Sequence, residues 1–202
     1  TYLHAAVHAP SDTDRAIAWL FGVGVTTHIH LVAGLRNPTV RRRYQATREM
    51  LTTIGRPDLY PPLLDLINPV PCSVQRCRSL VQNLAHIFDA TLDMPKGNFP
   101  FAGDISAVGR VGAIDDSLHL IDAGHPRDTL FWIGVTATRC LQILEAADPE
   151  RARPCRPVWN SMMATIGVPG PGTEAIRAAE MQSALTAIRR SADELIELVA
   201  VD

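Results

Sequence analysis

The stretch TLFWIGVTATRCLQIL, residues 129–144, decides the fold because it is apolar on most sides of a helix and follows a proline at position 126. Its main apolar stripe recurs at intervals of three and four residues, which is the spacing of one helical face. The stripe consists of Leu130, Ile133, Ala137, Leu141 and Leu144. We expect a helix from Pro126 to about Ala147 in the interior of a bundle.

Trp132, Thr136 and Arg139 form a second column on the same predicted helix. An unpaired charge on so apolar a helix is costly, so we expect Arg139 to have a carboxylate partner. Asp104 and Asp128 are both plausible partners. The column has two interpretations, as the wall of a ligand site and as part of a structural ion pair.

Helix start and stop signals repeat along the rest of the chain, and alternating strand patterns are nearly absent. Predicted helices begin at Ser11, Asn37, Pro57, Ser73, Asp104, Asp115, Pro126 and Thr173, and Gly55 and Gly124 end two of them. The sequence therefore predicts an all-α protein, a single compact bundle of about seven or eight helices over residues 1–202. Residues 1–11 are expected to be flexible or extended, and 173–199 to form a long C-terminal helix.

Composition places the chain among ordinary globular proteins, with 47% hydrophobic and 20% charged residues. A formal net charge of −2 argues against nucleic acid as a partner. The four cysteines show no CxxC spacing, which favours reduced thiols and a cytoplasmic location. No dinucleotide, phosphate-loop or nucleophile-elbow motif occurs, so we expect no cofactor. His4 and His8 have the spacing of zinc ligands but no accompanying glutamate, so we expect no metal site.

Residues 16–35, AIAWLFGVGVTTHIHLVAGL, carry no formal charge and are long enough to cross a bilayer. Their histidines, threonines and glycines weaken that interpretation, and the central helix of a bundle can have the same composition. We therefore expect no contact with a membrane. Helical steps place His28 with the core stripe and His30 nearly opposite it, so we expect His28 to be an interior, hydrogen-bonded histidine.

The connector GNFPFAGDIS, residues 97–106, is more apolar than most connectors. Phe99 and Phe101 either pack on the core as a plug or line a pocket. Asp104 is expected to be the N-cap of the helix that follows. Both interpretations of the connector, a plug on the core and the wall of a pocket, therefore stay open.

Four stretches share their order and pattern with a known group of proteins. They are LVAGLRNPTVRRRYQATREML (31–51), GRPDLYPPLLDLI (55–67), FPFAGDIS (99–106) and DTLFWIGVTATRCLQIL (128–144). Together they resemble the helical C-terminal half of bacterial nucleotidyltransferase-fold proteins, distantly related to the aminoglycoside nucleotidyltransferases. In that family a separate N-terminal domain carries Gly-Ser followed by Asp-x-Asp, whose carboxylates hold Mg²⁺.

This chain departs from that catalytic pattern. It contains no Gly-Ser, and its Asp12-Thr-Asp14 opens a predicted helix, where both carboxylates suit a capping role. The resemblance therefore implies a protein that keeps the half that shapes a substrate pocket and lacks the catalytic half.

The favoured hypothesis is a bacterial small-molecule-binding protein derived from such a substrate half, for which a homodimer is a compatible state. Its pocket would lie beside residues 97–106, between the helices that bear Tyr44 and Trp132. Arginines would bind an anionic group and aromatic rings would form apolar walls. The candidate binding residues are Tyr44, Arg43, Arg48, Phe99, Phe101, Trp132, Thr136 and Arg139.

Two alternatives stay open. A stand-alone, metal-independent enzyme of specialised metabolism would use Asp104 with His28 or Arg110 as acid–base groups, which requires a buried carboxylate. A structural protein would instead pair with a separately encoded transferase subunit. In the simplest interpretation, Arg41 and Arg48, which flank the inward stripe of the helix that bears Tyr44, form no more than a solvated basic face.

Overall fold

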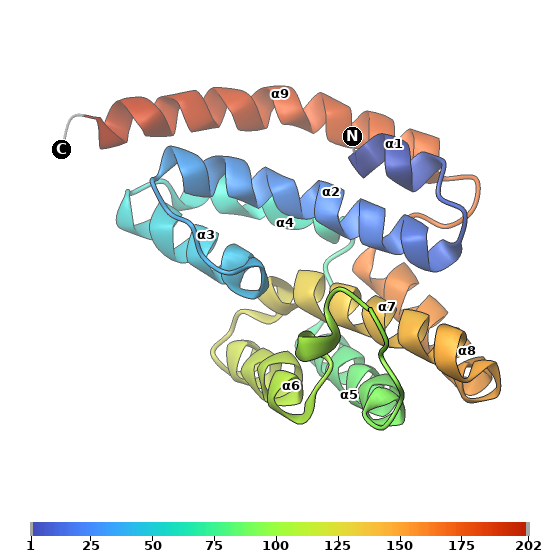
Figure 1. Ribbon diagram of the computed structural model, residues 1–202. Helices are drawn as coiled ribbons and strands as arrows, with labels where there is room; N and C mark the ends of the chain where they lie inside the picture. Colours follow the sequence, from blue (N-terminus) through green and yellow to red (C-terminus); the bar gives the residue numbers. More distant parts are fainter. Residues whose placement is uncertain (1, 201–202) are drawn as a thin grey trace.

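Two long apolar helices, α2 (Asp12–Ala33) and α7 (Leu130–Ala147), organise the computed structural model, which describes residues 2–200. Within that range the chain forms nine α-helices and four short 3-10 helices and has no strand, so the predicted all-α class is confirmed (Figure 1). Figure 1 shows α9 (Glu174–Val199) along one face of the molecule, with α2 beneath it and α7 towards the opposite face.

The helix α7 is buried on nearly all of its sides, as residues 129–144 predict. It packs against α2, α5 (Val74–Thr91) and α8 (Pro149–Ile166). One of its buried polar residues is satisfied locally: the hydroxyl of Thr138 donates to the carbonyl of Gly134 at 2.8 Å and accepts from Nε1 of Trp159 at 3.0 Å. The apolar stripe therefore forms the centre of the core without leaving this hydroxyl unpaired.

The helix α2 is buried on two faces, because α9 packs on one and α7 on another. His30 faces α9, with 1% of its surface exposed and Nε2 lying 2.8 Å from Oγ of Ser191. His28 is only partly buried. The prediction that His28 is the interior histidine and His30 its outward neighbour is therefore wrong, since it assumed a helix with a single buried face.

By length and composition α2 also qualifies as a membrane-spanning segment, the one such helix among residues 2–200. In the protein, 61% of its most apolar window is buried by other helices. A core helix passes the same test of length and composition, and the packing of α2 between α9 and α7 is that of a core helix.

Several predicted helix boundaries agree with the structure. The hydroxyl of Ser11 accepts from the backbone N–H of Asp14 at 3.0 Å, which makes Ser11 the N-cap of α2, and it donates to the carboxylate of Asp14 at 2.7 Å. Ser73 caps α5 by accepting from the N–H of Arg76. Gly55 adopts φ +79°, a left-handed conformation that few other residues take without strain, and the helix before it ends there.

Other boundaries differ. The third long helix, α3 (Arg43–Thr53), is preceded by a 3-10 turn, η1 (Val40–Arg42), that begins after Thr39 rather than at Asn37. The helices predicted at Asp104 and Asp115 are one helix, α6 (Ala107–Asp122), whose N-cap is Ser106. Ser106 takes this role because its hydroxyl reaches the N–H of Gly109 at 3.1 Å. Asp104 instead ends the short helix η3 (Ala102–Asp104).

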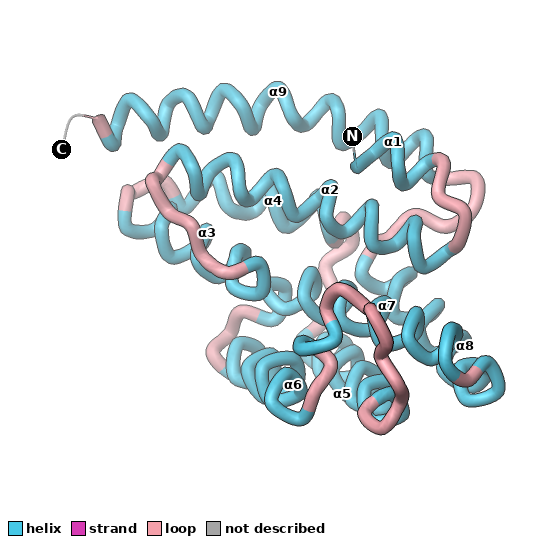
Figure 2. Tube along the Cα trace, viewed as in Figure 1, coloured by secondary structure: helices cyan, strands magenta, loops and turns pink. Residues whose placement is uncertain are grey.

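Two helices lie where none is predicted. Within the segment 1–11, expected to be flexible or extended, Tyr2–Val7 form α1, which packs on α2 and α9. Pro149 starts α8, although Pro154 and Pro157 also lie within that helix. Figure 2 shows the loops that remain, among them the connector from α5 to α6, which crosses over α7.

Candidate functional site

A pocket of about 350 Å³ opens between the start of α3 and one face of α6. The 3-10 helix η4 (Pro126–Thr129) and the first turn of α7 complete its wall. Its lining residues are Arg41, Arg42, Gln45, Gly112, Asp116, Ser117, His119, Leu120, Asp128, Thr129 and Trp132. The wall is therefore largely polar, with one large aromatic side chain and charges of both signs.

Gly112 sets the shape of the pocket on the side of α6. A methyl group at this position would collide with Nη1 of Arg41, so only glycine leaves room for the guanidinium group there. From this place Nη1 of Arg41 pairs with Oδ2 of Asp116 at 3.2 Å. Arg42, the next residue on the wall, is exposed and forms no ion pair with any residue from 2 to 200, so its charge is free to meet a ligand.

Asp128 is a fully satisfied carboxylate of the pocket wall, with 3% of its side chain exposed. Its Oδ2 accepts from Nε of Arg48 on α3 at 2.8 Å, and its Oδ1 accepts from the hydroxyl of Tyr60 at 2.6 Å. Tyr60 is the first residue of α4 (Tyr60–Ile67), so this carboxylate joins α3, α4 and η4. Burial, with a further contribution from the charge of Asp128, raises the pKa of Tyr60, and its phenol remains a hydrogen-bond donor.

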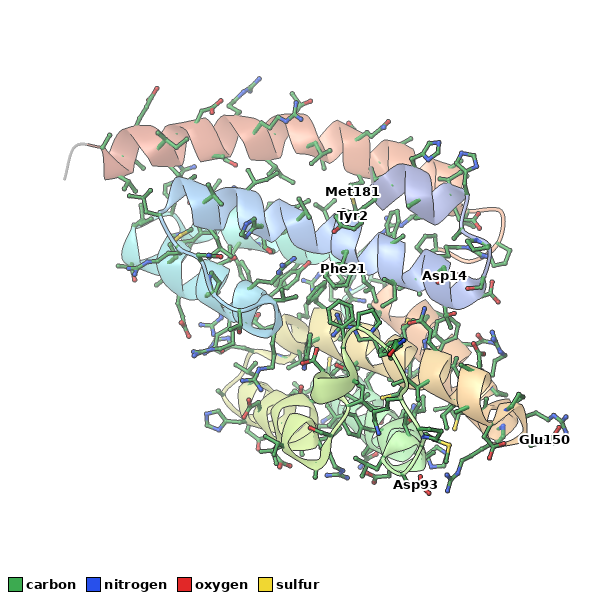
Figure 3. All side chains as sticks on the ribbon, viewed as in Figure 1. Tyr2, Asp14, Phe21, Asp93, Glu150 and Met181 are labelled. Atoms are coloured by element: carbon green, nitrogen blue, oxygen red, sulfur yellow. The ribbon has the colours of Figure 1, made fainter. Side chains whose placement is uncertain are left out.

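A group of rings and guanidinium groups lies where α2, α3 and α7 meet, and we call it the aromatic–arginine cluster. It consists of Phe21, Arg43, Phe101, Phe131, Trp132 and Arg139. Cζ of Arg43 lies 5.2 Å from the centre of the Phe131 ring, and that ring meets Phe21 edge-on at 5.7 Å. Figure 3 labels Phe21 on α2 and, above it, Tyr2 of α1, whose ring lies 6.1 Å from that of Phe21.

Arg139 has the carboxylate partner that its position predicts, since its Nη1 donates to Oδ2 of Asp104 at 2.7 Å. Its Cζ also lies 3.7 Å from the centre of the Phe101 ring and 5.7 Å from that of Trp132. Burial lowers the pKa of Arg139, whereas the charge and the hydrogen bond of Asp104 oppose that shift. The pair thus combines an ion pair with cation–π contacts at one end of the cluster.

Arg43, at the other end of the cluster, has no carboxylate partner among residues 2–200. Its Nε and Nη1 are enclosed and have no hydrogen-bond partner there. Burial lowers the pKa of Arg43, because a cation that leaves water without a counter-ion is destabilised. This guanidinium group therefore lacks a counter-ion, whereas those of Arg48 and Arg139 each have a carboxylate partner.

Three more enclosed donors without partners accompany Arg43: the hydroxyl of Tyr44, Nε1 of Trp132 and Oγ1 of Thr136. The ring of Tyr44 lies 5.9 Å from that of Phe131, the ring that Arg43 also contacts. Trp132 and Thr136 lie one turn apart on α7. The unpartnered donors therefore gather around the N-terminal half of α7. A molecule that accepts several hydrogen bonds would satisfy them.

The connector 97–106 agrees in part with the plug interpretation, because one of its two phenylalanines packs on the core and the other does not. Ile105 is its fully buried residue, Phe99 packs partly on the core, and Phe101 is 47% exposed and covers Arg139. No residue of 97–106 lines the pocket, which lies against α6 instead. The connector therefore adjoins the aromatic–arginine cluster through Phe101 and not the pocket against α6, and a ligand site beside it stays a prediction.

The acid–base groups expected for an enzyme are not assembled. Asp104 is 45% exposed and pairs with Arg139, so it is not the buried carboxylate that the enzyme hypothesis requires. Arg110 lies on α6 and donates to both oxygens of Asp89, at 2.6 and 3.0 Å. His28 makes no hydrogen bond or ion pair with Asp104 or any other residue from 2 to 200. In the same range no three side chains of His, Cys, Asp or Glu gather as metal ligands.

The sequence does not indicate that α6 forms one wall of the pocket. Asp116 was interpretable from the sequence only as a residue that favours the start of a helix, and Gly112 carried no signal of its own. Their roles come from the approach of α6 to η1 and α3, which are far away along the chain. The neighbouring arginines at 41–43 were the available signal, since a run of cations before a helix can face a site.

Comparison of the chain with known proteins gives no relative: no family model, no curated protein and no solved structure matches it. The resemblance to nucleotidyltransferase-fold proteins therefore stays a prediction. What the molecule does has to be inferred from the site itself.

Proposed function

We propose that this protein binds a small organic anion at the junction of α3, α6 and α7, in the pocket and the adjoining aromatic–arginine cluster. The observation that carries the proposal is the enclosed guanidinium group of Arg43, which has two nitrogens without a hydrogen-bond partner and no counter-ion. An acidic group of the ligand would supply the missing hydrogen-bond acceptors and the missing counter-ion.

The energetics favour a ligand over an empty site. More than about nine in ten buried polar groups in proteins have a hydrogen-bond partner, and an unpaired one costs about 1–3 kcal/mol. Here four side chains, Arg43, Tyr44, Trp132 and Thr136, have enclosed donors without partners in two helices that meet. A carboxylate or a phosphate accepts several hydrogen bonds at once and cancels the charge of Arg43.

The pocket defines the size and character of the rest of the ligand. Its volume of about 350 Å³ suits a small metabolite rather than a polymer. Trp132 offers an apolar surface to the pocket, and Arg42 of η1 adds an unpaired charge to the same lining. The ligand we expect therefore has a flat or apolar part, which contacts Trp132, and an acidic part, which the arginines bind.

The proposal agrees with the role that the resemblance implies, a substrate-binding half without its catalytic domain. The only Asp-x-Asp of the chain supports this, because both carboxylates are occupied at the start of α2. The carboxylate of Asp14 accepts from the hydroxyl of the N-cap Ser11, and Asp12 pairs with Arg15 at 2.8 Å. These residues hold the helix end together, which is a structural task.

Thermal unfolding with a panel of ligands tests the proposal. The panel contains inorganic phosphate, aryl carboxylates, nucleoside monophosphates and, as cationic ligands, aminoglycosides. A ligand at about a hundred times its Kd stabilises the protein by about 3 kcal/mol, which raises Tm by roughly 6–12 °C in a chain of this size. We expect at least one anionic compound to produce such a shift and the aminoglycosides to produce none.

Arg43→Gln identifies the residue that binds the anion, and Arg190→Gln on α9 is the matched control, since Arg190 is exposed and distant from the cluster. We expect Arg43→Gln to weaken binding tenfold to a hundredfold, the effect of about 1.5–3 kcal/mol for a charged hydrogen bond. The control should bind as the wild type does. The proposal is wrong if no anion shifts Tm, or if Arg43→Gln and Arg190→Gln bind the same anion equally well.

A further inference from the structure

Two of the four free cysteines lie close together although the sequence gives them no CxxC spacing. Cys72 belongs to the connector between α4 and α5, and Cys77 lies near the start of α5. Their sulfur atoms are 2.8 Å apart, and one thiol donates a hydrogen bond to the other. Cys140 and Cys155, by contrast, are buried inside α7 and α8 and have no such partner among residues 2–200.

The two sulfur atoms differ in their access to solvent. Cys72 is partly exposed, whereas Cys77 is completely buried beneath it, with 0% of its surface exposed. A reagent from solution can therefore reach Cys72 and not Cys77. Thiol–disulfide exchange uses two thiols that differ in this way. One thiol attacks the incoming disulfide, and a second, protected thiol then attacks the mixed disulfide that results.

The surroundings favour the thiolate at the exposed position. The hydrogen bond from Cys77 is the largest influence and lowers the pKa of Cys72 to about 7, with smaller contributions from the charges of Arg127 and Arg76. The same hydrogen bond raises the pKa of Cys77, so that thiol keeps its proton. A pKa near neutral pH gives Cys72 a high thiolate fraction without the loss of nucleophilicity that a much lower pKa brings.

Arg127 is fixed in place near these thiols. Its Nη2 donates to Oδ1 of Asp65 at 2.8 Å and to the carbonyl of Asn68 at 2.7 Å. Oδ1 of Asn68 in turn accepts from the backbone N–H of Cys72 at 3.1 Å, so guanidinium group, amide and cysteine form one connected unit. Nε of Arg127 is enclosed and has no hydrogen-bond partner among residues 2–200. The positive charge close to Cys72 is thus a built feature of the connector.

We propose that Cys72 and Cys77 form a reversible dithiol–disulfide site that reacts with low-molecular-weight disulfides such as glutathione disulfide. The Cys72 thiolate attacks one sulfur of glutathione disulfide, whose S–S bond breaks; a mixed disulfide forms on Cys72 and a glutathione thiolate leaves. Cys77 then gives its proton to solvent, attacks Sγ of Cys72 and releases the second glutathione thiolate. The protein loses two protons and two electrons, and glutathione disulfide takes up both and is reduced to two thiols.

A bound metal is a weaker explanation for the pair. Thiolate sites for zinc need four ligands, and the part of the chain from 2 to 200 offers no group of three possible metal ligands anywhere. Exchange chemistry needs only the two sulfur atoms and one exposed face, and the structure provides both.

Mass spectrometry of the reduced full-length chain after incubation with glutathione disulfide tests the proposal. The wild type should lose about 2 Da, and proteolysis should yield a peptide that links residues 72 and 77. Cys77→Ser should stop at the mixed disulfide on Cys72, a gain of about 305 Da. Cys72→Ser should react at least about tenfold more slowly, because its remaining thiols are buried.

The double variant Cys140→Ser/Cys155→Ser is the matched control, because it removes the two other buried thiols and leaves the pair intact. It should lose the same 2 Da or so as the wild type, at about the same rate. Dithiothreitol should return each oxidised protein to its starting mass. The proposal is overturned if the wild type accumulates only the glutathione adduct, if Cys72→Ser reacts as fast as the wild type, or if the control loses the reaction.

Discussion

Arg48 and Arg43 lie on the same helix, α3, and meet very different surroundings. Arg48 reaches Asp128, whose other oxygen is taken by Tyr60, so every charge in that region is balanced within the chain. Arg43 lies against Phe131, and its enclosed nitrogens have no partner among residues 2–200. The difference is that Arg48 has its counter-ion within the chain and Arg43 has none among residues 2–200, which is why we propose that a ligand supplies it.

Removal of the carboxylate should break the balanced region, with the largest effect on stability. Asp128→Ala leaves the partly buried guanidinium of Arg48 and the hydroxyl of Tyr60 without their acceptor. We expect the free energy of unfolding to fall by about 3 kcal/mol, and Tm by roughly 6–12 °C, measured by urea and thermal unfolding. Asp65→Ala, whose carboxylate is exposed in its pair with Arg127, is the control and should cost less than about 1 kcal/mol. Equal effects would contradict the assignment.

A larger side chain at Gly24, next to Arg43 and Phe131, should have the next largest effect on the free energy of unfolding. A methyl group at Gly24 would lie 2.7 Å from Cε2 of Phe131 and 2.9 Å from Nη1 of Arg43, so Gly24→Ala displaces the ring and the guanidinium group together. We expect a loss of about 1–3 kcal/mol in urea unfolding, together with weaker binding of the anion. Gly103→Ala, where a methyl group meets nothing within 4 Å, should cost less than about 0.5 kcal/mol. A stable Gly24→Ala protein would show that the cluster is loosely packed.

His30 is an intermediate case, because it is buried, its side-chain partner Ser191 is neutral, and it has no carboxylate partner among residues 2–200. Burial lowers the pKa of His30 and the charge of Arg56 lowers it further, although a backbone hydrogen bond at Thr26 opposes the shift. A lowered pKa means that the unfolded chain takes up the proton first, so stability is lost as the pH falls below the ordinary histidine range.

We expect the wild type to lose more stability than His30→Gln between pH 7 and pH 5, measured by urea unfolding at each pH. Each unit of pKa difference corresponds to about 1.4 kcal/mol, so the effect should be smaller than that of Asp128→Ala. His119→Gln, at an exposed position on the pocket wall, should keep the pH dependence of the wild type. Parallel curves for wild type and His30→Gln would exclude this role for His30.

Arg43→Gln should have the smallest effect on stability, and together with Arg48→Gln it tests the comparison of the two arginines most directly. Arg43→Gln removes a charge that the chain itself does not balance, so the free energy of unfolding should change by less than about 0.5 kcal/mol or should increase. Arg48→Gln, which breaks a balanced pair, should lower it by about 1–2 kcal/mol. Thermal unfolding without ligand measures both, and a larger loss for Arg43→Gln would show that Arg43 is structural after all.

Features that depend on neighbours along the chain were predictable from the sequence. The caps at Ser11 and Ser73 and the left-handed turn at Gly55 follow from backbone geometry within a few residues. The helix α7 followed from its apolar pattern, and the presence of a carboxylate partner for Arg139 followed from the cost of an unpaired charge, although the choice of Asp104 over Asp128 did not.

Features that depend on distant contacts were not predictable in the same way. Pro154 and Pro157 read as helix breakers, yet α8 continues through them, because the carbonyl groups they leave unbonded belong to the exposed residues Glu150 and Arg153, where water can replace the bond. The nearness of Cys72 and Cys77 depends on how the connector enters α5, and a spacing rule for cysteines does not capture it. The pocket wall from α6 has the same origin.

The bare backbone at Gly112 also has a consequence for selectivity. Because the guanidinium group of Arg41 rests where a side chain would otherwise project, its ion pair with Asp116 depends on the absence of a single methyl group. An alanine there would displace this flexible group and separate it from Asp116, so the pocket wall would lose a fixed pair of charges. For the ligand that we propose, the smallest residue of α6 thus decides where one positive charge of the wall lies.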